Sequence, residues 1–449
     1  MRRALVVAVT IAAFVWCLRP MWDMDVFWHV TVGRLILDEG IPRTDLLSAA
    51  HPEAPWVTFQ WLYEALLARV DGAFGLRGLQ VLHAGVLALS AGLAFGLALR
   101  RSGEVMPAFS AWMLGLLLLE DRVRERPHVF EVLFIVAMLP FATGRADGLA
   151  IGAVALAGLW ANLHAVSALW WLALAGAWAL TQPKRWPYVL AGVAVMLASP
   201  PAREGLLGAL ASHRSWPSEL VPELRSTWTY VHEGWWGAVM LGGVGLGMLA
   251  ALERLRRPGW EERLVALGCG VAALLIARWA WLAAVPIGLW LTDPERKHKL
   301  HLPLALACAL ALGARVGPRW PLEERFEVLQ RRAFPVAACD FLAERGLALP
   351  MDAYPQWSGY ALYRLHPPLR VLVDGRLVFG PDVAELILRR FQGDISTFDE
   401  AVARFHTVLL LWPTDNLPER DPERWKQLYA DDVASVWVAK PAWERVGLR

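Results

Sequence analysis

Residues 5–29 read LVVAVTIAAFVWCLRPMWDMDVFWH, an apolar run that ends in a short polar segment carrying Asp23 and Asp25. Arg2 and Arg3 precede the run, and no acidic residue does. Because positive charge stays on the inner side of a membrane, this pattern predicts a first crossing that starts inside and delivers two carboxylates to the outer face. Charge beside hydrocarbon is costly and is normally kept with a partner or a task, so the acidic pair is a candidate for function.

The composition is that of a multi-span membrane protein. Of the 449 residues, 56% are hydrophobic, 19% are charged and 25 are Trp, a residue that collects at membrane interfaces. The formal net charge of +2 gives no reason to expect nucleic acid as a partner. The four cysteines form no CxxC pair, so neither a disulfide framework nor a cysteine-ligated metal is expected.

Eleven apolar runs predict about eleven membrane-spanning helices, several of them short for a span of about 20 residues. The first run, residues 5–18, has no signal-peptide cleavage site and is expected to remain as a helix. The other runs are residues 76–99, 106–119, 128–143, 148–161, 165–180, 188–199, 234–252, 264–277, 280–291 and 300–314.

Lys and Arg in the loops set the expected orientation, because they favour the cytoplasmic side. The main exception is an expected outside loop with Arg122, Arg124 and Arg126, which is either balanced by neighbouring acids or kept for a function. If the N-terminus is inside, every alternate loop is basic; these loops carry Arg100, Arg101, Arg145, Lys184, Arg185, Arg254, Arg256, Arg257, Arg296, Lys297 and Lys299.

Two regions break the pattern of apolar hairpins. The expected outside loop at residues 19–75 contains two helix candidates, residues 26–37 and 59–70. From residue 317 the apolar runs cease and charges become frequent, so we predict a transmembrane domain over residues 1–316 and a soluble extracytoplasmic α/β domain over residues 317–449. Within the latter, the sequence predicts helices at 334–348 and 383–391 and strands at 370–373, 407–411 and 433–439.

Asp23 and Asp25 are separated by one residue, so their carboxylates share one side of an extended segment but diverge in a helix. Just after a helix end, the extended geometry is expected. One acid could then deprotonate a hydroxyl while the other orients the acceptor or holds a divalent cation, for which oxygen ligands favour Mg²⁺, Mn²⁺ or Ca²⁺. The alternative is structural: Asp25 caps a helix that begins at Val26, and Asp23 is solvated.

Other polar residues expected on the outer side are candidate substrate ligands. His29 follows Asp25 by one helical turn, and Asn162 and His164 lie in a tight turn between two spans. Arginines offer fixed positive charge for a phosphate at the membrane surface. Each group also has a structural alternative: a packed histidine, a polar turn, or arginines that reach lipid head groups. The candidates are His29, Arg122, Arg124, Arg126, Asn162, His164 and Arg278.

Residues 373–376, VDGR, follow a group of aromatic residues at 354–360. Asp374 and Gly375 fit an ordinary turn after a strand, or an acid beside rings that stack on a sugar. The sequence has no Gly-rich phosphate loop, no HExxH and no GxSxG, so nucleotide hydrolysis, zinc proteolysis and hydrolase-fold esterase chemistry have no support.

Several short motifs together resemble integral-membrane GT-C glycosyltransferases, in the bacterial branch related to protein mannosyltransferases and lipid A aminoarabinose transferases. The resemblance implies a polyprenyl-phosphate-linked sugar as donor, transfer on the extracytoplasmic face, and a modified DxD motif at Asp23 and Asp25, with one aspartate as base. It also implies that basic residues of other outside loops bind the donor phosphate, with Arg124 or Arg126 as the candidate. The motifs are DMDVFWH at 23–29, GRLILDEGIPRTDLLS at 33–48, WVTFQWLYEALL at 56–67, RERPHVF at 124–130, WANLH at 160–164 and VDGR at 373–376.

We therefore expect a glycosyltransferase of the bacterial inner membrane, with its N-terminus in the cytoplasm and its C-terminal domain outside. It would move a sugar from a polyprenyl phosphate to a hydroxyl of an envelope glycan, lipid or protein. The alternative is a non-enzymatic membrane protein, either a transporter of lipid-linked substrates or an envelope scaffold. Transporters place polar groups at the bilayer midplane, usually in repeated halves. This sequence shows no repeat and keeps its polar residues at the ends of the spans, which favours the enzyme.

Overall fold

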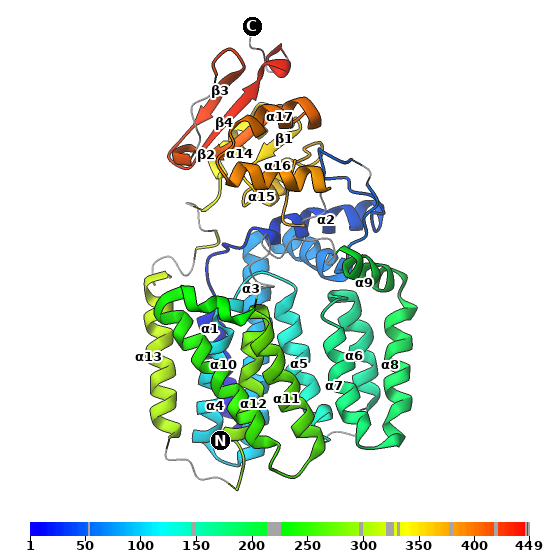
Figure 1. Cartoon of the computed structure of the whole chain (residues 1–449), viewed down its shortest axis with the longest axis vertical. Helices are drawn as coiled ribbons and strands as arrows, with labels where there is room; N and C mark the ends of the chain where they lie inside the picture. Colours follow the sequence, from blue (N-terminus) through cyan, green and yellow to red (C-terminus); the bar gives the residue numbers. More distant parts are fainter. Residues whose placement is uncertain are drawn as a thin grey trace. The chain divides into compact units, whose positions relative to one another are not determined.

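In the computed structural model the chain forms two compact units, and Figure 1 shows their elements. The helical unit consists of Met1–Pro20 and Gln80–Glu327, and the mixed unit of Met21–Leu79 and Val328–Arg449. Most of the long expected loop, from Met21 onward, therefore groups with the C-terminal segment, and the domain boundary between residues 316 and 317 stays a prediction. The structure describes all residues except 53, 145–149, 213–225, 296–299, 320–326, 330–332, 377–379, 417–420, 445, 446, 448 and 449, so Arg145, Arg296, Lys297 and Lys299 lie outside the described residues.

The helical unit is built from apolar helices, and in the described residues each predicted apolar run overlaps at least one helix, with the run at 280–291 covering both η6 and α12. Within the described residues, three helices are long and apolar enough to cross a membrane: Trp61–Ser102, Thr227–Arg254 and His301–Arg319. Shorter apolar helices accompany them, and the number of crossings stays a prediction. The elements are α1 (Arg2–Cys17), α4 (Val105–Leu119), η1 (Glu120–Arg122), α5 (His128–Ala142), α6 (Ala150–Leu163), α7 (Leu169–Leu180), η3 (Pro183–Arg185), α8 (Trp186–Ala198), α9 (Pro200–Ser212), η5 (Thr227–Glu233), α10 (Gly234–Arg254), α11 (Trp260–Leu275), η6 (Ala277–Ala283), α12 (Ala284–Leu291) and α13 (His301–Arg319).

Helix α3 (Trp61–Ser102) links the two units and is bent at Gly75. Gly75 has φ +61° and ψ −164°, a conformation that only glycine adopts without strain. The part before the bend carries Glu64 and Asp71, and the apolar run at residues 76–99 follows the bend. The bend thus separates a polar arm from a segment suited to lipid.

Small residues allow the helices of the helical unit to pack closely. Helix α4 packs on α13, α5 on α7, α6 on α8, and α10 on both α11 and α12. Where α10 meets η6, a Cβ added to Gly247 would lie 2.7 Å from the Cβ of Ala283. Close backbone approach at small residues is the usual way in which helices associate in membranes, where burial of apolar surface provides little driving force.

In the residues that the structure describes, the mixed unit combines five short α-helices, the polar arm of α3 and a four-stranded sheet in the order β1-β2-β4-β3. β1 pairs parallel to β2, with Met351 opposite Leu409, and β4 pairs antiparallel to both β2 and β3. A mixed sheet with helical connections is the predicted α/β type. The elements are α2 (Asp25–Glu39), α14 (Val336–Glu344), β1 (Met351–Ala353), α15 (Ser358–Leu365), α16 (Pro381–Phe391), α17 (Ser396–Phe405), β2 (Leu409–Pro413), η8 (Thr414–Asn416), β3 (Trp425–Ala430), β4 (Ala434–Ala439) and η9 (Lys440–Ala442).

Most local predictions for the mixed unit are confirmed. Helices occur at 26–37, 59–70, 334–348 and 383–391, and strands at 407–411 and 433–439, within a few residues at their ends. The predicted strand at 370–373 is wrong, because only Val371 pairs there, in single bridges to Ser48 and Met351.

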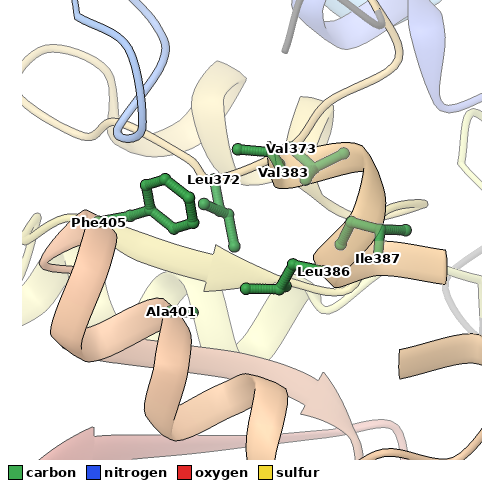
Figure 2. Packing of buried hydrophobic residues seen from close by; sticks show 7 residues of the cluster. All are labelled: Leu372, Val373, Val383, Leu386, Ile387, Ala401 and Phe405. Carbon is green, nitrogen blue, oxygen red and sulfur yellow. The ribbon is translucent and has the colours of Figure 1, made fainter. Parts of the chain in front are cut away.

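Local signals set the ends of the helices in the mixed unit. Helix α2 ends at Gly40, which has φ +90°, and α16 begins with Pro381, whose fixed φ suits the first helical position. Figure 2 shows the apolar cluster that α16 and α17 form with the segment preceding residue 374. The cluster comprises Leu372, Val373, Val383, Leu386, Ile387, Ala401 and Phe405.

Candidate functional site

The two acids of the DMD segment have different surroundings at the start of α2. Asp23 is 2% exposed, and its Oδ1 accepts a hydrogen bond of 3.0 Å from the backbone N–H of Asp25. Asp25 is half-buried and is itself the first residue of the helix. The extended geometry predicted for this segment is wrong, because Met24 between the acids already has helical torsions. The structural alternative needs the same correction, since Asp23 rather than Asp25 holds the helix start and is buried.

Three other parts of the mixed unit pack against α2, the first two at its start and the third further along the helix. A Cβ added to Gly359 would lie 2.7 Å from the carbonyl oxygen of Met24, so α15 approaches the helix start closely. A Cβ added to Gly375 would lie only 2.0 Å from Oδ1 of Asp25. The third part is the polar arm of α3, where a Cβ on Gly33 of α2 would lie 2.0 Å from the carbonyl oxygen of Glu64. Glycines therefore allow the backbone to surround the acidic segment.

His29 belongs to a buried polar cluster between α2 and the polar arm of α3. Its Nδ1 lies 3.3 Å from Oε1 of Glu64 and 3.2 Å from Nε2 of Gln60. The imidazole stacks on Trp28, with 3.6 Å between ring centroids, and meets the edge of Tyr63. His29 and Glu64 are 2% and 0% exposed. Its packing and hydrogen bonds agree with the structural alternative for His29, and a role toward a substrate stays a prediction.

The VDGR segment is more than an ordinary turn, because Arg376 lies between two buried carboxylates. Nη1 of Arg376 donates to Asp45 at 2.7 Å, while Nε and Nη2 donate to Asp374 at 2.6–3.0 Å. All three side chains are at most 4% exposed, and the guanidinium lies over the ring of Trp56. Burial opposes the charge, but the two carboxylates outweigh it and raise the pKa of Arg376, so the guanidinium stays protonated.

The predicted phosphate ligands lie in the helical unit, around the start of α5. The charges of Arg122, Arg126 and Arg278 all act on the imidazole of His128, whose Nε2 lies 2.8 Å from the carbonyl oxygen of Arg122. The structure thus brings Arg278, from η6, together with two of the three loop arginines. The charge of Arg124 acts instead on the side chains of Glu233 and Arg319. A buried bidentate ion pair joins this loop to the segment that follows α1, because Arg19 donates to Glu120 at 2.7 and 2.9 Å.

Asn162 lies in the last turn of α6, and His164 follows that helix in the connection to α7, so the predicted turn position is right for His164 alone. Nδ2 of Asn162 donates to the carbonyl oxygen of Gly158, and its Oδ1 accepts a bond of 2.6 Å from Ser199. His164 is 7% exposed, and its carbonyl oxygen accepts from Ser167. These contacts support the turn itself, so a role toward a substrate stays a prediction for both residues.

An apolar cavity of about 710 Å³ lies between helices of the helical unit. Its walls come from the second part of α3 and from α4, α5, η6 and α12. Leu116, Val136 and Leu289 are typical of the lining, which also includes the polar residues Arg101 and Thr143. The volume falls within the roughly 300–1,000 Å³ that is usual for ligand pockets.

A divalent cation at Asp23 and Asp25 stays a prediction. The donor set would be two carboxylates, and no group of three His, Cys, Asp or Glu suited to a metal ion occurs in the part of the chain that the structure describes. Mg²⁺ is often bound by one or two protein carboxylates together with substrate phosphate and water. The pair could hold such an ion only with oxygens from the bound donor.

Sequence reasoning found the acids, the arginines and the turn residues, but missed part of their surroundings. Glu64 and Gln60 lie in a segment that the sequence predicted only as a helix, and nothing in the sequence singled out Asp45. Gly375 was noted only as a turn residue. The available signal was the DGR triplet itself, because an acid and an arginine two residues apart after an apolar segment can form a buried ion pair.

No family model matches the chain, and no curated protein matches its sequence. A search of solved structures finds the crystal structure of ArnT from Cupriavidus metallidurans bound to undecaprenyl phosphate. The match has a TM-score of 0.53 and 12% sequence identity, and it covers 97% of each chain. The chain therefore has a GT-C-like fold along almost its whole length, and it is built as an integral membrane protein.

Proposed function

We propose that this protein transfers a sugar from a polyprenyl-phosphate donor to a hydroxyl of a cell-envelope acceptor. The observation that carries the proposal is the end-to-end likeness to a fold that, in ArnT, binds undecaprenyl phosphate. The helical unit offers an apolar cavity that suits an isoprenoid chain and arginines that suit its phosphate. The mixed unit offers a half-buried carboxylate at the start of a helix.

In this proposal Asp25 is the general base and Asp23 its support. The acceptor oxygen forms a bond to the anomeric carbon, and the bond from that carbon to the phosphate oxygen breaks, its electrons leaving with the polyprenyl phosphate. The hydroxyl proton passes to Asp25. Arg122, Arg126 and Arg278 stabilise the charge of the departing phosphate. We assign the base to Asp25 because Asp23 is buried and already accepts a backbone hydrogen bond.

The test is transfer of a labelled sugar from polyprenyl phosphate by purified protein in lipid vesicles. We expect Asp25→Asn to lower the rate by roughly 10²–10⁴-fold, the usual contribution of a positioned base. Asp38→Asn is the matched control, because Asp38 is an exposed acid of the same helix, and its rate should equal that of the parent. Undiminished transfer by Asp25→Asn would remove the assignment. Absence of transfer by the parent with several donors would favour the transporter or scaffold.

The proposed cation has its own test. If Asp23 and Asp25 hold a cation together with the donor phosphate, removing metal with EDTA should abolish transfer, and added Mg²⁺ or Mn²⁺ should restore it. Zn²⁺ should restore it less well, because the site offers only oxygen ligands. A rate that EDTA leaves unchanged would exclude the cation and leave Asp25 as a base acting alone.

A further inference from the structure

The backbone at Gly375 lies directly against the carboxylate of Asp25. A Cβ added to Gly375 would be 2.0 Å from Oδ1 of Asp25 and 2.9 Å from Nε1 of Trp28. Gly375 does not have a positive φ, so its backbone conformation is open to any residue. The need for glycine here therefore comes from the closeness of Asp25 and Trp28, and not from the geometry of a turn.

Residues 373–376 are held firmly in this place from both sides. Leu372 and Val373, 2% and 5% exposed, are fixed in the apolar cluster with α16 and α17 (Figure 2). On the other side of Gly375, Arg376 is fixed between Asp374 and Asp45. A segment anchored at both ends can define the position of a neighbouring side chain, whereas a loose loop could not.

Trp28 offers a hydrogen-bond donor beside the same glycine. Its side chain is buried, 5% of the residue being exposed, and none of the described residues accepts a hydrogen bond from its indole N–H. Buried polar groups without a partner are rare and call for an explanation. The indole donor and the Asp25 acceptor both lie next to one point, the place that a Cβ of residue 375 would occupy. A hydroxyl can accept one hydrogen bond and donate another, so it suits such a pair.

We propose that residues 373–376 are a working part of the acceptor site, with Gly375 as a positioning residue for Asp25 and Trp28. Gly375 lets Asp25 lie beside the indole, so that the acceptor hydroxyl receives a hydrogen bond from Trp28 and gives its proton to Asp25. This inference rests on the proposed function and deepens it, since it assigns the acceptor hydroxyl to a place formed by α2 and the 373–376 segment.

The first experiment measures geometry without activity, by carbodiimide labelling of carboxylates and mass spectrometry. In Gly375→Ala the new methyl group meets the far end of the Asp25 side chain, which can move more easily than backbone. We therefore expect an unchanged melting temperature and a several-fold change in the labelling of Asp25. Exposed Asp38 is the internal reference. Gly72→Ala is the matched control, because a Cβ at Gly72 has no atom within 4 Å, and it should change neither quantity.

The second experiment measures sugar transfer. Gly375→Ala should lower kcat by at least tenfold, because it displaces the base, whereas Gly72→Ala should retain the parent rate. Trp28→Phe keeps a ring but removes the donor, so it should raise KM for the acceptor several-fold with a smaller effect on kcat. The pH profile of Gly375→Ala should also shift on its acidic limb, which a loss of folded protein would not cause.

The outcomes separate the two proposals. Unchanged Asp25 labelling in Gly375→Ala would overturn the contact, whatever the activity. Changed labelling with parental transfer by Gly375→Ala would overturn the role of the segment while leaving sugar transfer intact. Absence of transfer by the parent protein would overturn the proposed function, and with it the role of residues 373–376 in catalysis. The labelling experiment would still show whether Gly375 contacts Asp25.

Discussion

Asp23 accepts a hydrogen bond from the first N–H of α2, so replacing Asp23 should lower the free energy of unfolding. We expect Asp23→Ala to destabilise the mixed unit by about 1 kcal/mol, the usual value of a side chain that satisfies a helix N-terminus. Asp38→Ala removes an exposed acid near the other end of α2, where a negative charge is unfavourable to the helix dipole, and it should be neutral or slightly stabilising. Thermal unfolding in detergent measures both. Equal melting temperatures for the two variants would show that Asp23 does not hold the helix start.

At the scale of single residues, the sequence predicted what depends on near neighbours. Asp23, Asp25 and His29 were recognised because they surround one helix start and follow helical spacing. Glu64 and Gly375 could not be assigned to the same site, because their contacts with α2 join positions 35 and about 350 residues apart. Nothing in a single sequence reports which distant glycine will meet a given carboxylate.

The turn between β3 and β4 depends on one acid. Asp431 accepts hydrogen bonds from Tyr429 Oη, Val433 N and Ala434 N at 2.6–2.7 Å. Burial alone would raise the pKa of Asp431, but these donors outweigh it and hold the pKa below its usual value. Since the folded-state pKa is depressed, the stabilisation is present above the unfolded pKa of about 3.9 and is lost as pH falls through the lower folded value.

We therefore expect Asp431→Ala to destabilise the protein at pH 7 by about 1 kcal/mol, the net worth of a typical hydrogen bond. The difference from the parent should shrink as pH is lowered from 5 toward 3. Asp432→Ala is the control, because Asp432 is exposed in the same turn. Melting temperatures across this pH range provide the measurement. A difference that is constant with pH would mean that the carboxylate charge does not act in the turn.

Among the secondary-structure elements, amphipathic or apolar runs were predictable and short paired segments were not. Helix α16 was predicted from the spacing of its apolar residues, and β2 and β4 were predicted from runs of apolar residues. Residues 371–373 have the same apolar character, but only Val371 pairs with other strand positions, since the segment turns into Asp374 and Gly375. Strand pairing depends on residues distant in sequence, so a short apolar segment alone cannot distinguish a strand from a buried loop.

At the scale of the whole molecule, the proposed function requires the mixed unit to lie outside the cytoplasm. Both parts of this unit, Met21–Leu79 and Val328–Arg449, must then be on the same side, since they form one compact body. A first helix that starts on the cytoplasmic side and an odd number of crossings satisfy this requirement. Lys and Arg in alternate loops give the same orientation.

Reporter fusions test this topology directly. A phosphatase that is active only outside the cytoplasm should be active when fused after Arg449 and inactive when fused at Gly103, an exposed position between α3 and α4. A green fluorescent reporter should give the opposite pattern. The two sites are matched because the expected topology places them on opposite sides of the membrane. Phosphatase activity at Gly103 with none at Arg449 would put Asp25 in the cytoplasm, where polyprenyl-phosphate sugar transfer of the proposed kind could not use it.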